Sequence, residues 1–166
     1  IKKRKEKEIS TETLVNLIEK TKRKKNFKIN NATKVFQALR IFVNKEISEL
    51  IGGIILATKF LKTGGKIIVV SFHSIEDKIV KYYFSSYSKN QTKPSRYLPD
   101  AKVKNQIFFE NYKNLVLRAN EFEVKENPPS RSAKLRYAIR SNSNFIYPKE
   151  LKNRFKKYLD LERLND

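Results

Sequence analysis

The chain has 166 residues, 39% of them hydrophobic, which is enough for one domain with appendages and too few for two complete domains. Lys and Arg number 37 against 17 Asp and Glu, and the net charge of +20 favours a polyanionic partner such as a nucleic acid. The absence of cysteine excludes disulfides, thiolate zinc sites and cysteine nucleophiles, and a single histidine, His73, argues against a metal centre.

The termini and the codon usage bear on the kind of protein. No apolar run approaches the roughly 20 residues that span a membrane, and no apolar segment follows the charged first residues, so we expect a cytoplasmic protein without membrane contact. The chain begins at Ile1 and contains no methionine, which indicates a fragment. The abundance of Lys, Asn and Ile also fits drift toward AT-rich codons, but drift does not explain why acidic residues are few.

The N-terminal third is predicted to be helical. Residues 1 to 28 are dense in Lys, and Leu14, Leu17 and Ile18 follow Ser10 at helical spacing, which predicts a short amphipathic helix with a possible Ser10 cap. From Ala32 to Leu61 apolar residues recur every three or four positions, which predicts one bent helix or two helices with a break near Asn44. These apolar positions are Phe36, Leu39, Val43, Ile47, Leu50 and Ile54.

A strand and a helix follow a glycine pair. Gly64 can end the preceding helix in the left-handed conformation. Residues 66–71 form a continuous β-branched apolar run, which predicts a strand covered on both faces, central in a sheet flanked by helices. We expect the next helix to start with Ser74 as its cap and Asp77 in a capping box. The buried stripe of this helix is expected to be Ile75, Ile79, Val80, Tyr83 and Phe84.

The last third has weaker signals. Residues 88–113 carry two prolines and little periodicity, which predicts a long exposed loop. Residues 114–118 and 135–139 are expected to form a late antiparallel strand pair at a sheet edge, joined through a rigid polar turn at 127–134. A terminal helix with a basic outer face is expected from Pro148 onward.

The strand end at Ser71 is the best candidate for a site, because ligands of open α/β folds bind at the carboxyl edge of the sheet. The serines, Phe72, His73 and the carboxylates of Glu76 and Asp77 could hold a flipped base by stacking and hydrogen bonding, although each has an equally plain role in capping or packing. The run 130–136 has hydroxyls and cations suited to phosphate contacts, or to solvent. Arg40, on an apolar helix, needs a carboxylate, a carbonyl or RNA as its partner. Candidates for catalysis are Ser71, His73 and Ser74. Candidate RNA contacts are Phe72, Arg40, Ser130, Arg131, Ser132, Lys134 and Arg136.

No segment of the sequence offers a nucleotide-cofactor cradle. The four glycines fall into two adjacent pairs, so no Gly-rich turn follows a strand, and there is no P-loop or nucleophile elbow.

Three separated segments, in order, resemble one family. They are residues 32–44 with Ala32-Thr33 and Val43-Asn44, the Ser71-Phe-His-Ser-Ile-Glu-Asp-Lys-Ile-Val-Lys81 block after Gly64-Gly65, and Asn127-Pro-Pro-Ser-Arg-Ser-Ala-Lys-Leu-Arg136. Together they are similar to the small-subunit ribosomal RNA methyltransferase H family, RsmH, also called MraW. The similarity runs from about residue 5 to about residue 141.

This resemblance implies methylation of the N4 of a cytidine in the decoding region of 16S ribosomal RNA, with S-adenosyl-L-methionine as cofactor and the 30S subunit as partner. It also implies the C-terminal part of a class I, Rossmann-like α/β methyltransferase fold. The expected organisation is the end of an inserted helical domain at 1–30, the C-terminal half of the methyltransferase domain at 31–145 and a basic helical tail at 146–166. The cofactor-binding motifs are expected upstream. The alternatives are a nonenzymatic basic RNA-binding module and an α/β domain whose charge is only codon drift.

Overall fold

The computed structural model describes residues 9–21, 32–90 and 106–163. Its elements follow one another in the order α1 (Thr11–Thr21), α2 (Thr33–Asn44), α3 (Glu46–Phe60), β1 (Lys66–Ser71), α4 (Ser74–Ser86), α5 (Glu121–Glu126), the 3₁₀ helix η2 (Pro128–Ser132), β2 (Lys134–Ile139), α6 (Lys149–Arg154) and α7 (Lys156–Arg163). The chain divides into two compact units, the second of which runs from Ile47 to Leu164. The mixed α/β class expected from the sequence is confirmed.

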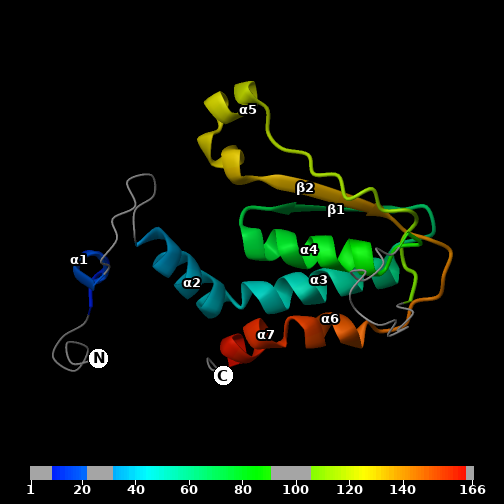
Figure 1. The fold of residues 1–166 in the computed structure, drawn as a ribbon, viewed down its shortest axis with the longest axis horizontal. Coiled ribbons are helices and arrows are strands. Elements are labelled where there is room, and N and C mark those ends of the chain that lie inside the picture. The colour runs from blue at the N-terminus through cyan, green and yellow to red at the C-terminus, as the bar shows by residue number, and fades with distance from the viewer. Residues whose placement is uncertain (1–8, 22–31, 91–105, 164–166) are drawn as a thin grey trace, which may run out of the picture. The chain divides into compact units, whose positions relative to one another are not determined.

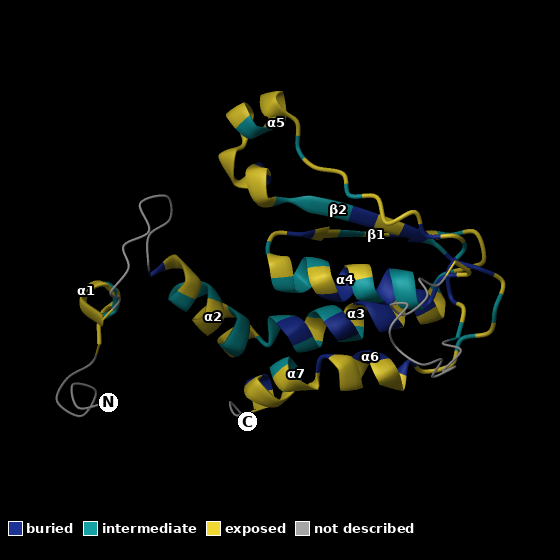
Figure 2. Ribbon diagram, in the orientation of Figure 1, coloured by how far each residue is buried: buried dark blue, intermediate teal, exposed yellow. Residues whose placement is uncertain are grey.

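The first unit holds α1 and α2. The hydroxyl of Ser10 accepts a hydrogen bond from the Thr13 N–H at 3.2 Å, so the predicted cap of α1 is confirmed. The predicted break near Asn44 is also confirmed, because Lys45 takes the left-handed conformation (φ 52°) and ends α2. No residue of α2 itself is buried (Figure 2), and its Val43 side chain is 61% exposed. The predicted apolar stripe is therefore fully buried only farther along, at Ile47 and Ile54 of α3.

The second unit is built on an antiparallel pair of strands. Residues of β1 face those of β2 from Lys66 opposite Ile139 to Ser71 opposite Lys134, and α4 packs along one face of the pair (Figure 1). Gly64 turns the chain into β1 with φ at 79°, as expected of a glycine that ends a helix.

None of the described residues covers the other face of the pair, which corrects the expectation of a strand buried on both sides. Ile67 is buried beneath α4, whereas Ile68 and Val70 are 59% and 50% exposed. Among the described residues β1 also has a strand neighbour on one edge only. The apolar run was read correctly as a strand, but the described chain supplies cover for half of it.

An aromatic cluster forms the core and overturns part of the predicted loop at 88–113. Phe108 and Phe109 are fully buried, and Phe109 contacts Tyr83 and Phe84 of α4 with ring centroids 5.5 and 5.2 Å apart. Phe109 also bridges Ser88 and Arg140 through backbone pairing. Hence Phe108, Phe109 and Tyr112 belong to the core, because their rings pack against the buried stripe of α4, whereas Ile107, Asn111 and Lys113 are exposed as predicted. Residues 91–105 of the predicted loop lie outside the described residues.

Buried polar groups in this core are satisfied internally. The Arg140 guanidinium, 6% exposed, donates hydrogen bonds to the backbone carbonyls of Thr58, Phe108, Ser141 and Ser143. The Tyr83 hydroxyl donates to Thr58 Oγ1 at 3.0 Å, and burial raises the pKa of Tyr83 well above its ordinary value. These bonds connect α3, α4 and the end of β2.

The C-terminal segment packs on the same core as two short helices. Leu151 and Phe155 are buried, and the Phe155 ring meets Tyr82 of α4 edge-on at 5.5 Å. Glu162 of α7, 3% exposed, accepts hydrogen bonds from the backbone N–H groups of Ile47 and Ser48, each at 2.9 Å, and from the Ser48 hydroxyl. A carboxylate 115 residues away thus caps the first turn of α3.

Two local elements differ from expectation. Residues 114–118 pair with β2 through a single bridge, Leu117 to Leu135, rather than as a full strand. Helix α5 was not predicted, and its cap is the Asn120 side chain, which accepts from Glu123 N–H at 2.8 Å. None of the helices in the described ranges combines the length and apolar character needed to cross a membrane.

Candidate functional site

Two of the segments that carry the sequence resemblance meet at one end of the sheet. β1 ends at Ser71 and α4 begins at Ser74, so Phe72 and His73 form the connection at the carboxyl end of β1. Ser71 lies opposite Lys134, and its hydroxyl donates a hydrogen bond to the Lys134 carbonyl at 3.4 Å. The η2 turn therefore leads into β2 at the same end of the sheet at which β1 finishes.

His73, rather than Ser74, caps α4, so the predicted cap was wrong by one residue. His73 is extended (φ −138°, ψ 164°), and its Nδ1 accepts a hydrogen bond from the Glu76 N–H at 3.3 Å. Glu76 completes the capping box by accepting from the His73 N–H. Ser74 takes the first helical position and is exposed. The His73 imidazole therefore accepts the capping hydrogen bond that we expected the Ser74 hydroxyl to accept.

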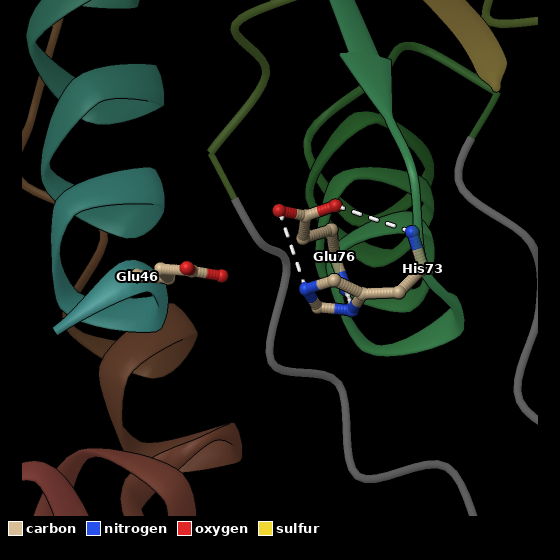
Figure 3. A group of neighbouring side chains, drawn as sticks. All are labelled: Glu46, His73 and Glu76. Atoms are coloured by element: carbon tan, nitrogen blue, oxygen red, sulfur yellow. Dashed lines mark hydrogen bonds and ion pairs between the residues drawn. The ribbon is translucent and has the colours of Figure 1, made fainter. Parts of the chain in front are cut away.

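Glu76 holds the whole connection in place (Figure 3). Its Oε2 accepts hydrogen bonds from the backbone N–H groups of Phe72 at 2.9 Å and His73 at 3.3 Å. Its Oε1 lies 3.3 Å from Nε2 of the His73 ring. Glu46, also labelled in the figure, belongs to the first unit.

Asp77 joins the start of α4 to β2. Its Oδ1 accepts from Arg136 Nε at 2.7 Å, and its Oδ2 accepts from Arg136 Nη2 at 3.3 Å and from Lys134 Nζ at 3.1 Å. Burial alone would raise the pKa of Asp77, but the hydrogen bonds and charges of Arg136 and Lys134 outweigh burial and hold that pKa below its ordinary value. Two of the predicted RNA-contacting cations are thus bound to a carboxylate of the protein.

Arg136 extends this cluster toward a segment that sequence reasoning missed. Its Nη1 donates to the Tyr112 hydroxyl at 2.9 Å and to Asn114 Oδ1 at 3.0 Å. Burial opposes the charge of Arg136, yet the bonds to Asp77 and Tyr112 raise its pKa above the ordinary value. For Tyr112 burial is the larger effect and raises the pKa of its hydroxyl, although the hydrogen bond and charge of Arg136 act in the opposite direction. No sequence signal near Tyr112 and Asn114 identified them, because the partner arginine is more than 20 positions away.

The remaining candidates differ in exposure. Phe72 is 55% exposed, and Arg131 and Ser132 of η2 are exposed as well. Ser71 and Ser130 are each 4% exposed, and the Ser130 hydroxyl has no hydrogen-bond partner among the described residues. An aromatic ring and a guanidinium therefore face solvent on the two segments that meet at this edge.

Arg40 lies in the first unit and is paired with a carboxylate, one of the three kinds of partner that we expected for it. Its Nε and Nη2 donate to the two carboxylate oxygens of Glu46 at 2.7 and 3.2 Å. This two-pronged pairing satisfies the guanidinium within its own unit.

The turn between β1 and α4 is not suited to binding a nucleotide cofactor. A cofactor cradle of this fold class needs free backbone N–H groups in a glycine-rich turn between a strand and a helix. In the described part of the chain, the turn from β1 to α4 contains no glycine, and the N–H groups of Phe72 and His73 are already bound to Glu76. The glycines lie instead inside α3 and in the turn before β1.

Comparison with known proteins places these features in a family context. The model of the MraW methylase family matches residues 1–141. The chain is 46% identical over 125 residues to the ribosomal RNA small subunit methyltransferase H of Bartonella henselae, covering 75% of this chain and 36% of that protein. It is 50% identical over 119 residues to the protein of that name from Bartonella bacilliformis, covering 72% of this chain and 35% of that protein. For that of Rhizobium etli the identity is 46% over 144 residues, covering 86% and 42%. The chain spans about two fifths of the length of these relatives.

Proposed function

Because this chain belongs to the MraW methylase family, we propose that it is the substrate-side part of an enzyme that methylates small-subunit ribosomal RNA. The observation that carries the proposal is that the segment Ser71–Ser74 and the η2 turn meet at one end of the sheet. A ribosomal substrate would place the reaction in the cytoplasm, and it accounts for the net charge of +20.

The uncovered face of the sheet supports a fold that extends beyond this chain. Ile68, Val70 and Leu117 are each at least half exposed on that face, and a hollow of about 260 Å³ lies between Val70, Leu117 and Leu135. An exposed apolar face of this kind indicates a missing packing partner. We assign that partner to the rest of a class I methyltransferase domain, whose helices would cover this face, whose strands would pair with the free edge of β1, and which would bind S-adenosyl-L-methionine. Within this scheme residues 1–30 end an inserted helical domain, 31–145 complete the methyltransferase domain, and 146–166 form the tail.

The chain's own residues would bind and orient the RNA. We propose that the substrate is a cytidine of the 16S decoding region in the 30S subunit, methylated at N4, and that the exposed Phe72 ring stacks on a base. Arg131 and Ser132 would contact phosphates. Ser71 and His73 would shape the connection, with the exposed Ser74 beside them. The cofactor supplies the methyl group when it is bound by the rest of the enzyme.

A second candidate is a nonenzymatic RNA-binding module. It is favoured by one observation, that the β1–α4 turn has no backbone N–H group left for a cofactor. Calorimetry with S-adenosyl-L-methionine and anisotropy with decoding-region RNA address both candidates on the chain as it stands. We expect no cofactor binding, and RNA binding that weakens steeply with salt. Tight cofactor binding would overturn our placement of the cofactor site. Absent or salt-independent RNA binding would overturn the RNA role.

The enzyme proposal needs a full-length protein. In the Bartonella henselae relative, the residue aligned with Phe72 would be changed to Ala, and methyl transfer to 30S subunits would be measured. We expect a loss of at least tenfold. The control is the same change at the position aligned with Phe60, which in this chain is 74% exposed on α3. Equal rates in both variants would remove Phe72 from the substrate site.

A further inference from the structure

Arg136 is bound on every side by the protein itself. Its side chain is 5% exposed, and its nitrogen atoms donate four hydrogen bonds, two to Asp77, one to Tyr112 and one to Asn114. An arginine offers five N–H donors, so at most one is left for any other ligand. A phosphate contact through more than that one donor would require this buried pair to open, which costs several times more than a surface contact returns. Direct RNA binding is therefore the wrong role to expect of Arg136.

The four bonds join three separate segments of the chain. Asp77 lies in the first turn of α4, Arg136 lies in β2, and Tyr112 and Asn114 lie in the segment that leads to the Leu117 bridge. Asn114 has φ at 53°, a conformation that costs free energy for a residue other than glycine. Its side-chain bond to Arg136 helps to hold it there. The guanidinium is thus the common partner of the elements around the sheet edge.

The carboxylate that Arg136 holds is adjacent to the one that holds the Phe72–His73 connection. Glu76 binds the backbone N–H groups of that connection, and Asp77, the next residue, is fixed to β2. The first turn of α4 therefore carries two anchors, one to the loop and one to the sheet. If the sheet anchor were lost, the turn that presents Glu76 would be free to shift, and Phe72 would shift with it.

We propose that Arg136 is a positioning residue, which fixes the Phe72–His73 connection for the RNA substrate by holding Asp77 and Asn114. The proposal rests on the proposed function for the identity of the substrate, although the positioning itself is a property of this chain. Lys134 has a lesser part, because its side chain is 28% exposed and it makes one bond to the same carboxylate.

The direct test is amide hydrogen exchange, measured by NMR on the 166-residue chain. Arg136→Gln removes the charge and most of the bonds to Asp77. We expect exchange at the Phe72 and His73 amides to rise by roughly tenfold to a hundredfold, as loss of charge-assisted bonds implies. The amides of Ile51 and Ile54 in α3 should change by less than about threefold. Unchanged exchange at Phe72 and His73, or an equal rise throughout α3, overturns the proposal.

Glu162→Gln is the matched control, since it removes a different buried carboxylate of the same unit. It should raise exchange at the Ser48 amide and leave Phe72 and His73 unchanged. If Arg136→Gln does not fold, Asn114→Gly decides the question, because glycine accepts φ near 53° and only the side-chain bond is lost. A rise of about threefold or more at Phe72 and His73 supports positioning. No rise there overturns it.

An activity measurement extends the test to the enzyme. In a full-length relative that has arginine at the position aligned with Arg136, that arginine would be replaced by Lys, which retains the charge but loses the planar pairing. We expect kcat for methyl transfer or KM for 30S subunits to change at least tenfold, with KM for the cofactor unchanged. An equal loss of affinity for the cofactor would indicate general disruption and overturn the proposal. If the unmodified relative transfers no methyl group, the proposed function fails, while hydrogen exchange still decides the positioning role.

Discussion

Replacing Glu162 by Gln tests whether the C-terminal helix is an integral part of the fold. The carboxylate accepts the N–H groups of Ile47 and Ser48 on different oxygens, and the second oxygen also accepts the Ser48 hydroxyl. In the variant one of these oxygens becomes an NH₂ group that faces donors, and the negative charge at the start of α3 is lost. Hydrogen bonds to a charged group contribute about 1.5–3 kcal/mol, and a partly buried charge at a helix end up to about 2 kcal/mol. We therefore expect the free energy of unfolding to fall by about 2–4 kcal/mol.

The assay is urea denaturation at neutral pH, with circular dichroism as the signal, and thermal unfolding as a second measure. For a unit of this size the expected loss lowers Tm by roughly 8–15 °C. Asp160→Asn is the control, because Asp160 lies on the same helix but is half exposed and 3.7 Å from Arg163, a pair that contributes less than about 1 kcal/mol. A loss below about 1 kcal/mol for Glu162→Gln, or equal losses in the two variants, would refute the reasoning.

Three further predictions concern the site and the core. The native pKa of Asp77 lies below its ordinary value, so the ionised carboxylate should stabilise the fold fully above about pH 3.9, and this stabilisation should disappear as pH falls through the native pKa. In urea titrations the free energies of unfolding of Asp77→Asn and of the unaltered chain should therefore converge in acid. A difference between them that persists in acid would contradict this. Phe72→Ala should change the free energy of unfolding by less than about 0.5 kcal/mol, since the ring is half exposed, yet weaken RNA binding in anisotropy by about fivefold or more, whereas Phe60→Ala should leave binding unaltered. Arg140→Met should destabilise the chain by about 3 kcal/mol or more in denaturation, because four carbonyls, three of them buried, lose the hydrogen bond that Arg140 donates; a loss under about 1 kcal/mol would indicate that water replaces it.

Local signals in the sequence predicted local structure well. The period of apolar residues located α3 and α4, the β-branched run located β1, and Gly64 marked the turn between them. Each of these features depends on neighbours within a few positions, which is the range over which helix and strand preferences act.

Features that depend on distant partners were not predictable from such patterns. The capping role of His73 was missed because serine is the usual cap, and only the extended backbone at residue 73 puts Nδ1 in reach of Glu76. The burial of Phe108 and Phe109 depends on rings of α4 more than 20 residues earlier. Lys134 and Arg136 were read as phosphate contacts because one sequence position gives no sign of which carboxylate will lie beside it.

The antiparallel pairing of the two strands bears on how the chain is made. Ser71 ends β1, and its partner Lys134 comes 63 residues later. At about 5–20 residues per second, a ribosome needs roughly 3–13 s to synthesise the interval. During that time the nascent chain carries an apolar β-branched segment without its partner strand, the kind of segment that is prone to aggregate. Lys62 and Lys66 lie just before this segment, and charges beside such a segment oppose association between chains. Some of the lysines of this basic chain are therefore useful before it has folded.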